Sequence, residues 1–189
     1  EIDEGAVMDK EAEEHLKDAT KVLSKYGDML AVRCFPEFKD WNEEKQDLML
    51  KNLLKWSDKP VINMETVSHP CQALAMMQLI KSKFPEPKKK KFVLTWAYHP
   101  KALNTAVANS ALLIASMFGM DITVANPSGY DLDPYYINKA KDNCKKNNIA
   151  FKISNDQEEA LKDADFVYAK SWGSLENYGQ PNNPSLISW

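Results

Sequence analysis

Glycine is scarce in this sequence, with only 6 residues in 189. No G-x-G-x-x-G run and no Walker pattern follows any strand-like segment, so the usual phosphate loops of nucleotide-binding proteins are missing. A nucleotide-binding α/β domain is therefore disfavoured. The sequence also lacks a G-x-S-x-G elbow, which argues against a serine hydrolase of the α/β type.

Cysteine is equally sparse. Cys34, Cys71 and Cys144 lie far apart and show no metal-ligand spacing. This pattern is typical of reduced thiols in the cytoplasm, and we expect neither a metal nor a cofactor. Cys71 follows the start of a predicted helix, yet no histidine stands beside it in sequence as a base, so a cysteine nucleophile is a weak option.

Long apolar runs and clustered positive charge are missing too. No segment has the length of a membrane span, and no charged-then-apolar leader opens the sequence. The net charge is −3, and the single basic run, residues 88–91, follows two prolines. We interpret this run as a solvated loop and expect neither a nucleic acid nor a membrane as partner.

What is present is an alternation of strands and helices. Short apolar runs predict strands at 29–33, 61–64, 92–96, 122–125, 150–153 and 165–169, and helical spacing predicts helices at 9–26, 42–56, 70–84, 102–118, 134–147 and 156–161. Such an alternation calls for parallel sheets covered by helices on both faces. A linker rich in proline and lysine at 84–91 separates two such units. The expected fold is α/β with two three-layer units.

Polar and aromatic side chains concentrate where the predicted strands end. In open parallel sheets, ligands bind outside the carboxyl ends of the strands. Clusters stand at 33–36, 65–72, 96–104 and 170–173. Within them Trp96 and Trp172 could wall a pocket, whereas His99 is more typical of a turn. This concentration predicts a binding site at one rim of the molecule.

His69 is the sharpest candidate. Pro70 suits the first position of a helix, where free backbone N–H groups and the positive end of the helix dipole favour an anion or a polarised carbonyl oxygen. A neutral imidazole donating to a carbonyl is the natural role there, and Gln72, three residues on, can face the same ligand. The alternative is that His69 caps the helix and Gln72 completes the cap. Spacing alone leaves both interpretations open.

Four other polar residues have two interpretations each. Arg33 at a strand end suits a phosphate or carboxylate, or an ion pair with a nearby acid. Glu65 suits a substrate amine, or a bracing role in a loop. Asn104, expected one turn into a helix, suits a ligand amide or the surface. Lys170 suits a substrate carboxylate, or a solvated loop.

Taken together, the motifs resemble a known family. The run Val61–Glu65 followed by His69-Pro70-Cys71-Gln72 resembles the His-Pro-x-Gln signature of aspartate and ornithine carbamoyltransferases. The runs 94–110 and 168–173 resemble the branch that acts on N-acylated ornithine. The resemblance covers essentially the whole sequence.

The resemblance implies transfer of a carbamoyl group from carbamoyl phosphate to the δ-amine of an N-acylornithine. It implies that His69 and Gln72 bind the carbamoyl group, with His69 polarising its C=O, and that Arg33 binds carbamoyl phosphate. It implies that Glu65, Asn104 and Lys170 hold the acylornithine. Chemistry of this kind is positioning and electrostatic stabilisation without a covalent enzyme intermediate.

The resemblance also places Glu13 near the acyl group. A carboxylate there would repel a succinyl carboxylate and tolerate acetyl, so N-acetylornithine is the expected acceptor. The alternatives are an ordinary first-turn helix glutamate, a succinyl-specific enzyme, and a non-catalytic module that binds an amino acid.

The resemblance divides the sequence into the C-terminal part of a carbamoyl phosphate-binding domain (1–68), a connecting helix and linker (69–90), and an incomplete acylornithine-binding domain (91–189). The family's Ser/Thr-Arg-Thr-Arg phosphate loop and His-Cys-Leu-Pro segment do not occur in the sequence. We therefore expect an internal part of a carbamoyltransferase, truncated at both ends and with little or no transferase activity alone. The family is trimeric, which implies a homotrimer for the full-length protein.

Overall fold

The computed structural model describes residues 12–189, with side chains from Leu16 onward. What we call the first unit contains α1 (Ala12–Tyr26), β1 (Leu30–Arg33), α2 (Trp41–Glu44), α3 (Leu48–Trp56) and β2 (Val61–Glu65). Helix α4 (Pro70–Lys83) follows. The second unit contains β3 (Lys91–Trp96), α5 (Ala106–Met117), β4 (Asp121–Ala125), α6 (Pro134–Asn147), β5 (Phe151–Ser154), α7 (Gln157–Leu161), β6 (Phe166–Lys170) and a 3₁₀ turn, η1 (Pro184–Leu186).

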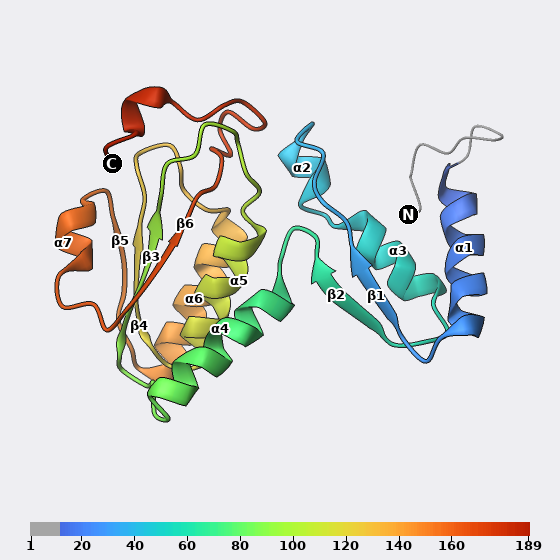
Figure 1. Cartoon of the computed structure of the whole chain (residues 1–189), viewed down its shortest axis with the longest axis horizontal. Helices are drawn as coiled ribbons and strands as arrows, with labels where there is room; N and C mark the ends of the chain where they lie inside the picture. Colours follow the sequence, from blue (N-terminus) through green and yellow to red (C-terminus); the bar gives the residue numbers. More distant parts are fainter. Residues whose placement is uncertain (1–11) are drawn as a thin grey trace.

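Both sheets are parallel, as the alternation of strands and helices predicted. Strands β1 and β2 pair with each other, and the second unit has the order β5-β4-β3-β6. Helices α5 and α6 cover one face of this second sheet and α7 lies beside the other, so the unit has three layers (Figure 1). The α/β class with parallel sheets is confirmed.

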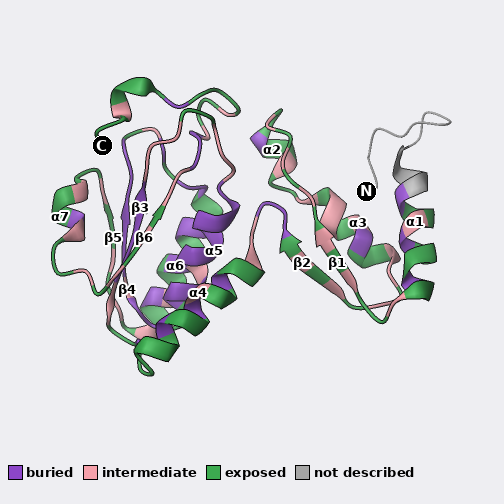
Figure 2. Ribbon diagram, in the orientation of Figure 1, coloured by how far each residue is buried: buried purple, intermediate pink, exposed green. Residues whose placement is uncertain are grey.

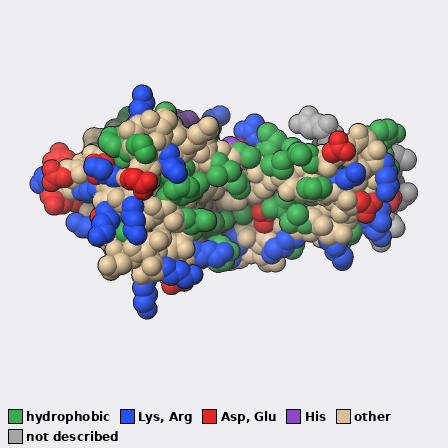
Figure 3. Space-filling model, turned by 90° about the horizontal axis from the view of Figure 1, so that it is seen from below, with side chains coloured by type: hydrophobic (Ala, Val, Ile, Leu, Met, Phe, Trp, Pro, Cys, Tyr) green, Lys and Arg blue, Asp and Glu red, His purple; other side chains and the backbone are tan. Residues whose placement is uncertain are grey.

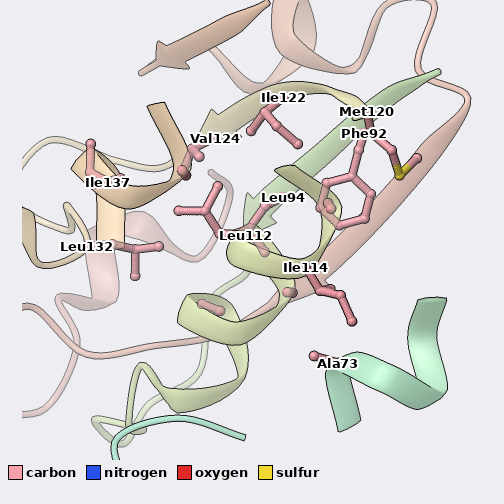
Figure 4. Close-up of a cluster of buried hydrophobic side chains, with 14 of the residues drawn as sticks. Ala73, Phe92, Leu94, Leu112, Ile114, Met120, Ile122, Val124, Leu132 and Ile137 are labelled. Atoms are coloured by element: carbon pink, nitrogen blue, oxygen red, sulfur yellow. The ribbon is translucent and has the colours of Figure 1, made fainter. Parts of the chain in front are cut away.

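The main hydrophobic core lies in the second unit. Phe92 and Leu94 on β3 and Leu112 on α5 are almost fully buried, and they pack together in one cluster (Figure 4). Ala73 and Met77 on α4 belong to the same cluster. Helix α4 is therefore anchored to the second unit by its buried side, although it directly follows the first unit.

The first unit is less buried, as the colouring in Figure 2 shows. Alternate residues on its two strands, including Ile62 and Met64, are exposed. Leu74 on α4 is exposed as well. Hydrophobic side chains accordingly extend across the middle of the molecule in the view from below (Figure 3). Among the described residues, no helix combines the length and apolarity needed to cross a bilayer.

Several sequence-based expectations need correction. The helix predicted at 42–56 is two helices, α2 and α3, separated at Asp47, whose φ is +53°. Its carboxylate accepts the hydroxyl of Thr66 instead of capping α3. Helix α5 begins at residue 106 rather than 102, so Asn104 lies in the preceding loop. Trp96 and Trp172 are fully buried and belong to the core rather than to a pocket wall.

The two units are joined by polar contacts around α2. The indole N–H of Trp41 donates to Asp133 Oδ2 over 2.7 Å, and both residues are buried. The hydroxyl of Tyr178 hydrogen-bonds Glu44 on the same helix. Tyr178 also packs its ring against Trp41 at 5.7 Å between centroids. These contacts hold α2 against the second unit.

Candidate active site between the two units

The strand order of the second unit creates a switch point beside β3. Along the chain, β4 and β5 are added on one side of β3, and β6 then returns to the other side of β3. The carboxyl ends of β3 and β6 meet where Ala97 N–H donates to the Lys170 carbonyl over 3.1 Å. Ligands in open α/β sheets bind at such a point. This topology places Lys170 at the rim where the sequence predicted a site.

The first unit contributes a compact charged cluster from its own strand ends. Arg33 ends β1 and Glu65 ends β2, and the two residues are partners in the register of the sheet. Arg33 donates to Glu65 Oε2 through Nε at 3.2 Å and Nη2 at 3.0 Å. His69 Nε2 lies 3.4 Å from the same oxygen. The carboxylate is 7% exposed, whereas the Arg33 side chain is 57% exposed and accessible to an anion.

The hydrogen bonds of His69 assign its tautomer. His69 is the N-cap of α4, and its Nδ1 accepts the backbone N–H of Gln72 over 3.3 Å. An accepting Nδ1 carries no proton, so the proton of the neutral ring sits on Nε2. Nε2–H points to Glu65 and is available as a donor. The capping and ligand-facing interpretations of His69 are therefore compatible, because they use opposite sides of one ring.

Gln72 does not take the capping role that spacing had left open. Its side-chain amide donates to the hydroxyl of Tyr168 over 2.8 Å and does not complete the cap. Tyr168 stands on β6, so this bond links the start of α4 to the second sheet. Tyr168 lies in the run 168–173, and no local sequence signal marks it as a partner of Gln72.

A cavity of about 270 Å³ joins three of the predicted residues. It lies between the units and is lined by Phe35, Phe38, Glu65, Ala102, Leu103, Asn104, Val107 and Lys170. Glu65 closes one side, while Asn104 and Lys170 come from the second unit. Phe38, with φ +65°, and Val107 were not predicted as lining residues, and no local signal marked them. Phe35 stood in the cluster after Arg33.

Asn104 reaches the cavity from the loop before α5. Its Oδ1 also accepts the backbone N–H of Ala106 over 3.2 Å, which fixes the first turn of the helix. His99 is the turn residue that its context predicted, since its Nδ1 accepts the N–H of Lys101. Glu13 lies in the first turn of α1, and its side chain is outside the described residues.

Two larger cavities of about 390 and 590 Å³ lie along the loop before α2 and between α3 and α6. Among the described residues, neither is lined by one of the predicted site residues. We therefore place the candidate site by its chemistry rather than by the size of the cavity. Beside the smaller cavity, Glu65 brings a buried carboxylate together with the Arg33 guanidinium and the His69 imidazole.

Two α/β units that bring charged strand ends to a cleft are characteristic of enzymes that bind small molecules between domains. Comparison with known proteins is more specific. Residues 1–82 match the aspartate/ornithine carbamoyltransferase carbamoyl-P binding domain, and residues 94–185 match the Asp/Orn binding domain of the same family. The chain belongs to the aspartate/ornithine carbamoyltransferase family.

The identities to individual relatives indicate which branch of the family the chain resembles more. The chain is 48% identical over 182 residues to an N-acetylornithine carbamoyltransferase of Xylella fastidiosa, covering 95% of this chain and 54% of that protein. It is 34% identical over 183 residues to an N-succinylornithine carbamoyltransferase of Bacteroides thetaiotaomicron, with the same coverage. A crystal structure of acetylornithine transcarbamylase complexed with acetylcitrulline has a TM-score of 0.87 and 47% identity, covering 95% of this chain and 55% of that one. The chain thus spans about half the length of the relatives that it matches.

Proposed function

We propose that this chain forms part of an enzyme that transfers a carbamoyl group from carbamoyl phosphate to the δ-amine of N-acetyl-L-ornithine. The products are N-acetyl-L-citrulline and phosphate. The observation that carries the proposal is the meeting of Arg33, Glu65 and His69 beside a cavity that also contains Asn104 and Lys170. The similarity to N-acetylornithine carbamoyltransferases supports this acceptor over free ornithine.

His69 and Arg33 take the carbamoyl phosphate. The Nε2–H of His69 donates to the carbonyl oxygen, whose negative charge grows as the amine attacks. Arg33 pairs its planar donors with the phosphate oxygens and stabilises the leaving group. The new C–N bond forms as the C–O bond to phosphate breaks, and the proton lost from the amine ends on phosphate. Gln72 takes the carbamoyl amide, which requires its side chain to leave Tyr168.

Glu65, Asn104 and Lys170 take the acceptor. The Glu65 carboxylate orients the δ-amine once Arg33 has moved from it to the phosphate. Lys170 pairs with the α-carboxylate, and the Asn104 amide hydrogen-bonds the acyl-amide end. Phe35 and Val107 add apolar side chains to the wall of the same cavity. No group of this chain forms a covalent bond with substrate in this scheme.

Glu13 sets the preference for acetyl over succinyl through charge repulsion. A solved relative in which one glutamate was replaced has been crystallised with carbamyl phosphate and N-succinyl-L-norvaline. We expect a replacement of Glu13 to admit a succinyl group in the same way. We test this with Glu13→Pro in the full-length protein. A shift of kcat/KM toward N-succinylornithine would support the role of Glu13 in the choice of acyl group. An unchanged preference would show that Glu13 does not determine this choice.

We further propose that the full-length protein is a cytoplasmic homotrimer in arginine biosynthesis. We place the carbamoyl phosphate-binding domain in residues 1–68, a connector in 69–90 and the acylornithine-binding domain in 91–189. The family resemblance supports the trimer, and the linker at 84–91 supports the division. Sedimentation of the full-length protein tests the trimer.

The central experiment is a transfer assay on the full-length protein that carries this chain. Mass spectrometry follows N-acetylcitrulline formed from carbamoyl phosphate and N-acetylornithine. We expect His69→Ala to lower kcat by about a hundredfold or more, because it removes the donor to the carbonyl oxygen. His99→Ala is the matched control, since His99 is a turn residue. Binding of N-acetylornithine in calorimetry without product, and without dependence on carbamoyl phosphate, would instead establish a non-catalytic binding module.

A further inference from the structure

The loop between β2 and α4 carries His69, and the first unit holds one side of it. The side-chain amide of Asn63 donates to Thr66 Oγ1 at 2.9 Å and to Ser68 Oγ at 3.2 Å. The Thr66 hydroxyl donates in turn to Asp47 Oδ2 at 2.7 Å. Burial raises the pKa of the Asp47 carboxyl. These bonds fix residues 66–68 but do not reach the backbone of His69.

The second unit holds the other side of the same loop, through contacts that have no local signal in the sequence. The backbone N–H of His69 donates to Ser110 Oγ on α5 over 2.7 Å. The carbonyl of Val67 accepts from Asn109 Nδ2 at 3.2 Å and from the hydroxyl of Tyr136 at 3.3 Å. Ser110, Asn109 and Tyr136 are 7%, 0% and 8% exposed.

Asn109 is held in one orientation by these bonds. Its Nδ2 donates both to the Val67 carbonyl and to Thr105 Oγ1, the latter at 3.0 Å. Its Oδ1 is buried and has no hydrogen-bond partner among the described residues. Leaving a buried acceptor unpaired is unfavourable, so such a group in a native structure calls for a reason. Here the orientation of the amide lets one of its donors serve the Val67 carbonyl in the His69 loop.

We propose that Ser110 and Asn109 are positioning residues for His69. This proposal rests on the function proposed above and adds that the second unit, through α5, aims the imidazole. Ser110 fixes the backbone of the N-cap residue at φ −129° and ψ 72°, from which the ring reaches back so that Nδ1 accepts from Gln72. The same orientation directs Nε2–H toward the ligand. The packing of α5 against the loop between β2 and α4 thereby selects the Nε2–H tautomer of His69.

The test compares Ser110→Ala with Ser116→Ala in the full-length protein. Ser116 is a matched control, because it lies further along the same helix, is fully buried, and uses its hydroxyl for bonds to Leu113 and Asn143. Both variants lose a buried hydroxyl from α5, but only the first loses the contact with His69. Nitrogen chemical shifts of the three histidine rings report the tautomers without any substrate.

We expect His69 to be the Nε2–H tautomer in the wild type and in Ser116→Ala, and a mixture of tautomers in Ser110→Ala. We expect kcat of Ser110→Ala to fall between about ten- and a hundredfold, with KM for carbamoyl phosphate nearly unchanged, because a displaced group lowers the rate more than binding. Equal tautomers and equal kcat in the two variants would overturn the proposal.

A measurement on the wild type covers the case in which Ser110→Ala does not fold. The His69 amide proton should exchange slowly with solvent, since Ser110 accepts it inside the protein. Fast exchange of this amide in the folded wild type would overturn the proposal. The tautomer and exchange measurements need no turnover, so they remain decisive even if the protein proves to have no transferase activity.

Discussion

The bond between Trp41 and Asp133 offers a direct test of how the two units are held together. Trp41 stands on α2 and Asp133 caps α6, where its other oxygen accepts the N–H of Tyr135 over 2.8 Å. We would make Trp41→Phe, which removes the indole donor and keeps an aromatic ring. We would combine it with Asp133→Ser, because serine remains a good N-cap but is too short to reach the indole.

The structure sets the expected size of the coupling free energy between Trp41 and Asp133. The indole N–H donates to a carboxylate over 2.7 Å, with Trp41 8% and Asp133 6% exposed. A buried hydrogen bond to a charged group contributes about 1.5–3 kcal/mol. Lys45 Nζ lies 3.6 Å from Asp133 Oδ2 and still stabilises this carboxylate in part when Trp41→Phe removes the indole donor. We therefore expect a coupling near the lower end, about 1.5 kcal/mol.

Urea unfolding of the wild type, both single variants and the double variant gives the coupling directly. Far-ultraviolet circular dichroism follows the transition, and the cycle cancels the loss of ring area in Trp41→Phe and the small void in Asp133→Ser. A coupling below about 0.5 kcal/mol would refute the reasoning, because it would mean that the bond does not hold the units together in solution.

Four further predictions concern other parts of the molecule. An added Cβ at Gly179, where φ is +79°, would lie 2.6 Å from the Phe38 carbonyl oxygen, so Gly179→Ala should destabilise by about 2 kcal/mol in thermal unfolding. Iodoacetamide should modify the exposed Cys71 and spare the buried Cys144 in peptide mass spectrometry. Burial raises the pKa of the Cys144 thiol to about 11, whereas an unfolded thiol has a pKa of about 8.5. The stability that the buried neutral thiol contributes is therefore fully present below the pKa of the unfolded thiol. It is lost as the pH rises through the pKa of the folded thiol. Lys170→Gln should raise KM for N-acetylornithine about tenfold or more and change kcat little, and an unchanged KM would contradict its proposed role.

Local sequence signals were sufficient where an element is specified by its own residues. Helix α6 was predicted with its observed bounds, because Asp133 and Pro134 mark its start and Asn148 adopts the left-handed conformation at its end. The predicted helix 42–56 contains no glycine or proline, so nothing local marked its break. The break depends on Asp47, which bonds Thr66 from a distant part of the sequence.

The site shows the same division between local and distant signals. The rule that ligands bind at the carboxyl ends of parallel strands selected Arg33, Glu65 and Lys170 correctly as strand-end residues. Whether they perform the proposed chemistry stays a prediction. Ser110 could not be found this way, because a serine inside an apolar helix carries no signal until the helix is packed against the His69 loop.

The position of β6 has a consequence for the order in which the protein folds. Neighbouring strands β3, β4 and β5 pair across one intervening helix each, whereas β6 returns to β3 across two other strands of the sheet. Closing that longer loop costs more chain entropy, and contacts of high sequence separation form slowly. Lys170 ends β6, so its side chain reaches the cavity only after this late pairing. We expect nascent or refolding molecules to acquire a stable core before they acquire a complete binding cavity.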